Sequence, residues 1–190
     1  SLTVTAGEMV TITGRTGAGK STLFKLILGL YQPREGQVRI FGCDPSRLAP
    51  AVRRQVFGYV EQQFHAISGT VADQISLKDP RVTAGAIEKA LHLVGLWDTC
   101  CALPQGLDTP FRPELFSRGQ SQLLSIARAV VMNPQILLFD EITANLDSLT
   151  ESQVLQALQA AAKDRTVLSI SHRLYEAQGG RRVVIGETEA

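Results

Sequence analysis

The residue types with the clearest chemistry lie in one glycine-rich stretch, residues 14–21, which reads G-R-T-G-A-G-K-S. The spacing G-x-x-x-x-G-K-[ST] lets the backbone curl so that successive N–H groups point at phosphate oxygens. Lys20 supplies positive charge toward the β- and γ-phosphates, and Ser21 supplies a hydroxyl for Mg²⁺. We interpret the stretch as a P-loop. The residues predicted to contact the nucleotide here are Gly14, Arg15, Thr16, Gly17, Ala18, Gly19, Lys20, Ser21 and Thr22.

The elements that must position this loop are visible on both sides of it. Residues 9–13 are short, β-branched and apolar, which is typical of a strand. Residues 21–28 are helix formers with apolar positions three and four apart. A glycine turn arising by chance needs neither flank, so the strand–loop–helix order favours the P-loop.

A second set of polar residues follows an apolar run at residues 135–141. Such a run is typical of a strand buried on both faces of a parallel sheet, with its acids at the carboxyl end where ligands bind. We interpret it as a Walker B strand. Asp140 would hold Mg²⁺ through its water shell, and Glu141 would polarise the attacking water as a general base. The alternative is a solvated strand end.

A third feature is the start of a predicted helix over residues 121–131. Ser117 and Gln120 have the S-x-x-Q spacing of a capping box, so the helix could begin here for purely local reasons. A helix N-terminus with a free hydroxyl and a glycine N–H is also able to bind an anion. The sequence leaves both interpretations open at this point.

In this order the motifs resemble those of the ATP-binding cassette of ABC transporters, over residues 6–173. Residues 117–120 resemble the signature motif, 58–62 the Q-loop, 143–147 the D-loop and 170–173 the switch histidine. A P-loop alone would have left kinases, GTPases and helicases open. The resemblance implies an ATPase that uses ATP and Mg²⁺ to power transport across a membrane.

The resemblance also implies roles for single residues. Gln62 would give an amide oxygen to Mg²⁺ or the attacking water, although an ordinary amide at a strand end is the simpler alternative. His172 would donate to the γ-phosphate and orient Glu141, although a lone histidine is more often structural. The predicted catalytic set is therefore Glu141, His172, Gln62 and Lys20, and the metal ligands are Ser21, Gln62 and Asp140.

The family resemblance further implies that the signature of one cassette faces the P-loop of a second. Ser117, Gly119, Gln120 and Asp147 would then contact the nucleotide of a partner cassette, identical or different. A transmembrane permease domain, in the same or another chain, is the other expected partner. The expected location is the cytoplasmic face of the cell membrane.

The implied fold is α/β, a single P-loop NTPase domain over residues 1–190 with a mostly parallel sheet. A small antiparallel β subdomain is expected around residues 36–42, and a helical subdomain inserted over 64–113. Residues 1–5 alternate like a strand and begin abruptly, which suggests a fragment. The aromatic residue that stacks on adenine in the family would then lie upstream.

Within the family, residues 68–75 and 107–110 resemble the exporter branch. The sequence differs from the usual signature at Phe116, in place of leucine, and at Arg118, in place of glycine. Neither difference changes the hydroxyl or the glycine N–H expected to face phosphate. Residues 111–115 are shorter than the glycine-rich segment that exporters place before the signature, where contact with the membrane domain is expected.

The composition of the chain narrows the possible partners and kinds of site. The formal net charge is +1, and the charged residues are spread along the chain without forming blocks. Nucleic acid is therefore not an expected partner. No apolar run approaches the ~18 residues that span a bilayer. Cys43, Cys100 and Cys101 lack the C-x-x-C spacing of a metal site and are expected to be reduced cytosolic thiols that behave as small buried hydrophobes.

Two rival functions come from other classes of protein. A DNA-repair or chromosome-maintenance ATPase shares these motifs but carries a long coiled coil after the Q-loop, where this chain has a short segment. A regulatory cassette that closes on ATP without turnover would be expected to lack the base or the switch histidine. Glu141 and His172 are both present, which favours an active ATPase.

Overall fold

A five-stranded sheet is the centre of the molecule in the computed structural model, which describes residues 1–140, 147–170 and 179–186. Its strands are β1 (Met9–Thr13), β2 (Phe57–Val60), β3 (Ile136–Asp140), β4 (Thr166–Ile170) and β5 (Arg181–Val184). Their spatial order is β2-β3-β4-β1-β5, and each of these neighbouring pairs is parallel. The expected α/β fold with a parallel sheet is confirmed.

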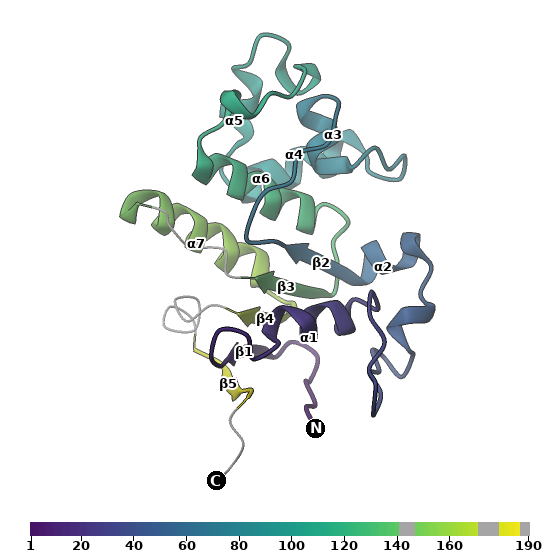
Figure 1. The fold of residues 1–190 in the computed structure, drawn as a ribbon. Coiled ribbons are helices and arrows are strands. Elements are labelled where there is room, and N and C mark those ends of the chain that lie inside the picture. Colours follow the sequence, from purple (N-terminus) through teal and green to yellow (C-terminus); the bar gives the residue numbers. More distant parts are fainter. Residues whose placement is uncertain (141–146, 171–178, 187–190) are drawn as a thin grey trace.

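Helices connect and cover the strands (Figure 1). They are α1 (Lys20–Ile27), α2 (Pro50–Val56), α3 (Val71–Ser76), α4 (Ala84–Leu93), α5 (Trp97–Cys101), α6 (Arg118–Val130) and α7 (Ser148–Ala162). Single 3₁₀ turns occur at Pro45–Arg47, Gly106–Asp108 and Pro113–Leu115. In Figure 1, α3, α4 and α5 lie together above α6, away from the sheet. These three helices fall in the range expected for the helical subdomain.

Strands β1, β2, β3 and β4 bury side chains on both faces, as expected for a parallel sheet under helices, whereas the edge strand β5 is largely exposed. Leu137 and Phe139 of β3 pack in a core cluster with residues of α6 and α7. Ile136 and Leu138 pack in a second cluster with Phe24 of α1. Because side chains alternate along a strand, Asp140 points to the same face as Leu138, toward the P-loop helix.

The strand order brings the two predicted phosphate-site elements together. The P-loop follows β1, and Asp140 ends β3, while β4 lies between these two strands. All three strands run in the same direction, so their carboxyl ends meet at one edge of the sheet. This is the edge where ligands bind in open α/β sheets.

The expected antiparallel β subdomain is not formed by the described residues. Around residues 36–42 there is only one antiparallel bridge, between Ile40 and Cys43. Phe41 and Gly42 both have left-handed φ, 50° and 80°, and make a tight two-residue turn. The preceding backbone finds no partner strand within the described ranges. Residues 1–5, expected to be strand-like, are also irregular.

The cysteine expectation is only partly met. Cys100 is buried, but Cys43 and Cys101 are exposed, and all three are free thiols. Cys101 lies at the end of α5, on the side of that short helix away from the core cluster that includes Cys100.

Among the described residues, no helix combines the length and apolar character that membrane crossing requires.

Candidate nucleotide site

The loop at residues 14–19 has the backbone that its glycines predict. Gly19 caps α1 with a left-handed φ of 88°, a conformation that strains other residues. A Cβ on Gly14 would lie 2.4 Å from the carbonyl oxygen of Ile185, so only glycine fits beside β5. The chain therefore enters α1 through a sharp turn whose residues 15–17 are exposed.

Lys20 lies folded over this loop. Its Nζ donates to the carbonyl oxygens of Gly14, at 2.9 Å, and Arg15, at 3.1 Å. These contacts hold the ammonium group at the mouth of the loop. A polyphosphate cradled by the loop amides would meet that charge without a large rearrangement of the lysine.

Asp140 and Ser21 meet across 119 residues of sequence. The Ser21 hydroxyl donates to Oδ1 of Asp140 at 3.4 Å, and Asp140 is 8% exposed. The other oxygen, Oδ2, accepts from the hydroxyl of Tyr59 at 3.1 Å. Burial, and next the negative charge of Asp140, raise the pKa of Tyr59 well above its usual value, so the phenol keeps its proton.

This pair suits the metal that the loop implies. Mg²⁺ prefers oxygen ligands, keeps several waters and is bound by one or two carboxylates together with substrate phosphates. A serine hydroxyl beside a carboxylate at the P-loop is a donor set of this kind. Elsewhere in the described ranges, no group of three or more His, Cys, Asp or Glu side chains could hold a metal ion.

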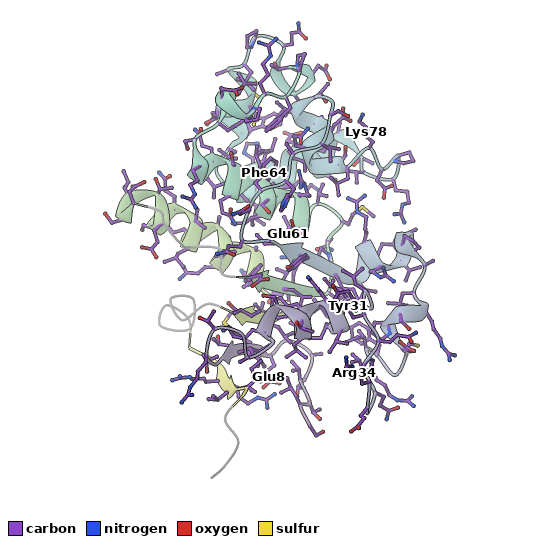
Figure 2. All side chains as sticks on the ribbon, in the orientation of Figure 1. Glu8, Tyr31, Arg34, Glu61, Phe64 and Lys78 are labelled. Atoms are coloured by element: carbon purple, nitrogen blue, oxygen red, sulfur yellow. The ribbon has the colours of Figure 1, made fainter. Side chains whose placement is uncertain are left out.

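Gln62 lies in a different neighbourhood. β2 ends at Val60, and the chain then leaves the sheet toward α6, where Gln122 donates to the carbonyl oxygen of Glu61 at 3.1 Å. Figure 2 labels Glu61 at the end of β2 and Phe64 beside α6. Gln62 lines a cavity of about 290 Å³ with Arg118 and Ser121. The described hydrogen bonds do not join it to Ser21 or Asp140, so its role as a metal ligand stays a prediction.

The predicted signature begins α6 with a complete capping box. The Ser117 hydroxyl accepts from the Gln120 amide at 3.2 Å, and the Gln120 side chain accepts from the Ser117 amide at 2.9 Å. The local explanation is therefore correct, and the exposed end of the helix remains able to meet an anion. Gly119 is buried, and a Cβ there would lie 2.0 Å from Cγ2 of Thr150 on α7.

Asp147 begins α7 as its N-cap. Its carboxylate accepts from the Thr150 amide at 3.0 Å, and the hydrogen bonds from Thr150 lower the pKa of Asp147. Thr150 thus contacts both predicted motifs, the signature through Gly119 and the D-loop through Asp147. The predicted base Glu141 and the predicted switch His172 lie outside the described residues.

Tyr59 is the site residue to which sequence reasoning gave no role. It lay inside the quoted Q-loop motif, yet nothing in residues 58–62 indicates a contact with residue 140. The signal appears once β2 and β3 are paired, because Tyr59 then stands opposite Leu138 on the face that carries Asp140. A tyrosine is long enough to reach the carboxylate two residues further along.

Comparison with known proteins agrees with this geometry. A family model described as ABC transporter matches residues 1–144. The chain is 38% identical over 190 residues to the toxin RTX-III translocation ATP-binding protein of Actinobacillus pleuropneumoniae, covering 98% of this chain and 27% of that protein. It is 38% identical over 189 residues to a multidrug efflux ATP-binding/permease protein of Mycobacterium bovis, covering 98% of this chain and 16% of the relative.

A solved structure has the same fold. It is a bacterial Atm1-family ABC exporter with ATP bound, with a TM-score of 0.81 and 35% sequence identity. The match covers 96% of this chain and 32% of the exporter chain. The chain therefore spans about a third or less of each of these relatives.

Proposed function

This chain belongs to the ABC transporter family, as its ATP-binding cassette, and from that premise we propose that it hydrolyses ATP to ADP and phosphate to drive export across a membrane. The observation that carries the proposal is the meeting of Ser21 and Asp140 beside the P-loop lysine. The relatives include translocation, efflux and exporter proteins, which supports export as the direction.

In this proposal the loop binds and orients the polyphosphate. Its amides and the N-terminus of α1 would donate hydrogen bonds to the phosphate oxygens, and Lys20 would exchange its carbonyl partners for the β- and γ-phosphates. Ser21 and Asp140 would hold Mg²⁺, which would neutralise charge on the phosphate oxygens. Gln62 would add an amide oxygen to this site; in the structure it lines the cavity beside α6.

The hydrolytic step is assigned to Glu141 and His172, which follow β3 and β4 in the sequence. Glu141 follows Asp140 directly and would accept a proton from the attacking water, while Asp140 stays with the metal. His172 follows β4, the strand between the P-loop strand and the Walker B strand, and would donate to the γ-phosphate. Both assignments rest on the sequence order and the family.

The proposed partners are a second cassette and a permease domain. The nucleotide held by the second cassette would be contacted by Ser117, Gly119, Gln120 and Asp147 of this chain. The exposed start of α6 supports this assignment, because it leaves the Ser117 hydroxyl accessible from outside the chain. The Mycobacterium bovis relative is named as an ATP-binding/permease protein, which supports a permease as the second partner.

The test of this function measures ATP binding and ATP turnover by the 190-residue chain. We expect Lys20→Ala to weaken ATP binding by about 2–5 kcal/mol in calorimetry, because a charge-assisted contact to phosphate is lost. Lys25→Ala is the matched control. It removes a lysine from the same helix, but one whose Nζ lies over the ring of Tyr31, so ATP binding should not change. Equal affinities for all three chains would contradict the P-loop assignment.

Glu141→Gln separates binding from chemistry. Glutamine keeps the shape but loses the basicity, so ATP binding should persist while turnover slows by on the order of 10²-fold. Unchanged turnover would remove Glu141 from the role of base. A parent chain that binds ATP without any turnover would instead favour the regulatory cassette.

A further inference from the structure

The carboxylate of Asp140 is held from two sides by different elements. Ser21, in the first turn of α1, donates to Oδ1 at 3.4 Å. Tyr59, in β2, donates to Oδ2 at 3.1 Å. Asp140 is 8% exposed, so few water molecules can replace either donor. The orientation of this buried carboxylate is thus set by the protein, and Tyr59 is one of its two donors.

Tyr59 itself is fixed by packing. It stands opposite Leu138 in the β2–β3 ladder, which places its side chain on the face of the sheet toward α1. There its ring meets Phe24 of α1 edge to face, with centroids 6.3 Å apart and planes at 86°. Phe24 is fully buried, so this contact leaves the Tyr59 ring little freedom. A phenylalanine at position 59 would keep the ring contact and lose only the hydroxyl.

We propose that Tyr59 is a positioning residue of the metal site, whose hydroxyl turns the Asp140 carboxylate so that Oδ1 faces Ser21. This inference rests on the proposed function, because it assigns the Ser21–Asp140 pair to Mg²⁺. Outer partners that orient a metal ligand commonly change metal affinity when they are removed. Tyr59 touches neither metal nor nucleotide in this proposal and acts only through Asp140.

Tyr59 also lies close in sequence to the predicted metal ligand Gln62. It lies three residues before Gln62, in the strand that leads out to the α6 cavity. The carboxylate is therefore contacted by the strand that leads directly to the predicted metal ligand Gln62. A shift of β2 relative to β3 would reach Asp140 through the Tyr59 hydroxyl.

The experiment compares Tyr59→Phe with the parent chain in Mn²⁺ binding. Mn²⁺ is titrated by electron paramagnetic resonance in the presence of saturating AMP-PNP, which is not hydrolysed. AMP-PNP affinity is measured separately by calorimetry with EDTA present. We expect Tyr59→Phe to weaken Mn²⁺ binding by about tenfold and to leave metal-free AMP-PNP affinity within about twofold. Activity need not be measured.

Tyr31→Phe is the matched control, because it removes the same hydroxyl from an exposed tyrosine. Tyr31 lies beyond the C-terminal end of α1 (Figure 2), and its ring contacts Lys25. Both affinities should equal those of the parent. The melting temperatures of all three chains are recorded beside the titrations.

Three results would overturn the inference. Unchanged Mn²⁺ affinity in Tyr59→Phe would show that the hydroxyl only fills a core position. Tighter Mn²⁺ binding would show that it neutralises the carboxylate and does not orient it. An equal loss of Mn²⁺ and metal-free AMP-PNP affinity would indicate general damage to the site. If the parent itself retained no Mn²⁺ with AMP-PNP, the metal assignment in the proposed function would fail, and the Tyr59 role with it.

Discussion

At the scale of single residues, Gly119 combines a predicted role with an observed one. The family resemblance assigns its N–H to phosphate, while the structure places it where α6 approaches α7. A methyl group there would lie 2.0 Å from Cγ2 of Thr150. Loss of activity on substituting Gly119 is therefore no evidence for a phosphate contact unless packing is tested separately.

We predict that Gly119→Ala lowers the free energy of unfolding by about 1–3 kcal/mol, because the helices must separate or Thr150 must leave its rotamer. Gly85→Ala in α4 is the control. Nothing lies within 4 Å of a Cβ at Gly85, so the same change should raise stability by up to about 1 kcal/mol. Urea unfolding of both variants measures the difference.

The cause is checked by Thr150→Ser, which removes Cγ2 and keeps the backbone amide that Asp147 binds. The double variant Gly119→Ala with Thr150→Ser should recover most of the lost stability. If Gly119→Ala and Gly85→Ala changed stability in the same direction and by the same amount, the packing explanation would be wrong.

At the scale of elements, an ion-pair cluster joins α2 to the segment after α3. Asp79 accepts from Arg54 of α2 at 2.9 Å and from Arg81 at 2.6 Å, and its side chain is 10% exposed. Arg54 also donates to the carbonyl oxygen of Ser76 at 3.1 Å. The segment after α3 is thus held to α2 by ion pairs and hydrogen bonds, and α2 itself has no buried residue.

This cluster predicts a pH dependence of stability. The hydrogen bonds from Arg81, followed by the nearby positive charges, lower the pKa of Asp79 well below its usual range. In the unfolded chain an aspartate titrates near ~3.9. A lowered pKa in the folded state stabilises the fold at pH values above that point, and the contribution is lost as the pH falls through the folded pKa.

Asp79→Asn should therefore lower the urea midpoint at pH 6 and reduce the further loss of stability between pH 4 and pH 2.5, compared with the parent. Asp108→Asn is the control, because Asp108 is exposed and forms no ion pair within the described part of the chain. An acid-side slope in Asp79→Asn as steep as that of the parent would contradict the role of this cluster.

At the scale of the whole molecule, the proposed nucleotide site is a composite site, formed by the P-loop of one chain and the signature of a second. Ser117 caps α6, so an arginine there would disturb the helix as well as any phosphate contact. Asp and Asn both cap helices as well as Ser does. Ser117→Asp therefore adds a negative charge while keeping the cap, and Ser117→Asn keeps the cap without that charge.

We predict that Ser117→Asp still binds ATP through its own P-loop but does not form an ATP-dependent dimer with itself, because its carboxylate repels the phosphates of the partner's nucleotide. Ser117→Asn should dimerise. Mixing Ser117→Asp with Lys20→Ala should restore dimers, since one of the two composite sites then has an intact P-loop and an intact signature. Size-exclusion chromatography with light scattering measures each mixture, in the Glu141→Gln background to prevent turnover. Dimerisation of Ser117→Asp alone would contradict the head-to-tail arrangement.

Local sequence patterns were sufficient to predict several elements and motifs of this molecule. The strand at residues 9–13, the P-loop and the helix after it follow from contiguous residue types, and the structure has them with boundaries shifted by one residue or less. The apolar run ending at Asp140 and the capping box at Ser117 are equally local. Such features depend on backbone propensity and on hydrogen bonds within a few residues, so they can be read along the chain.

The sequence by itself determined the P-loop, the Walker B carboxylate, the order of the motifs and the parallel α/β fold. Only the tertiary structure decided that Tyr59 would reach Asp140, that Thr150 would lie against Gly119, and that a single bridge between Ile40 and Cys43 would stand where a small sheet was expected. Each of these depends on strand register or helix approach between segments far apart in sequence. A register shift of one residue would turn Tyr59 to the other face of β2, and no pattern within residues 58–62 records which register is adopted.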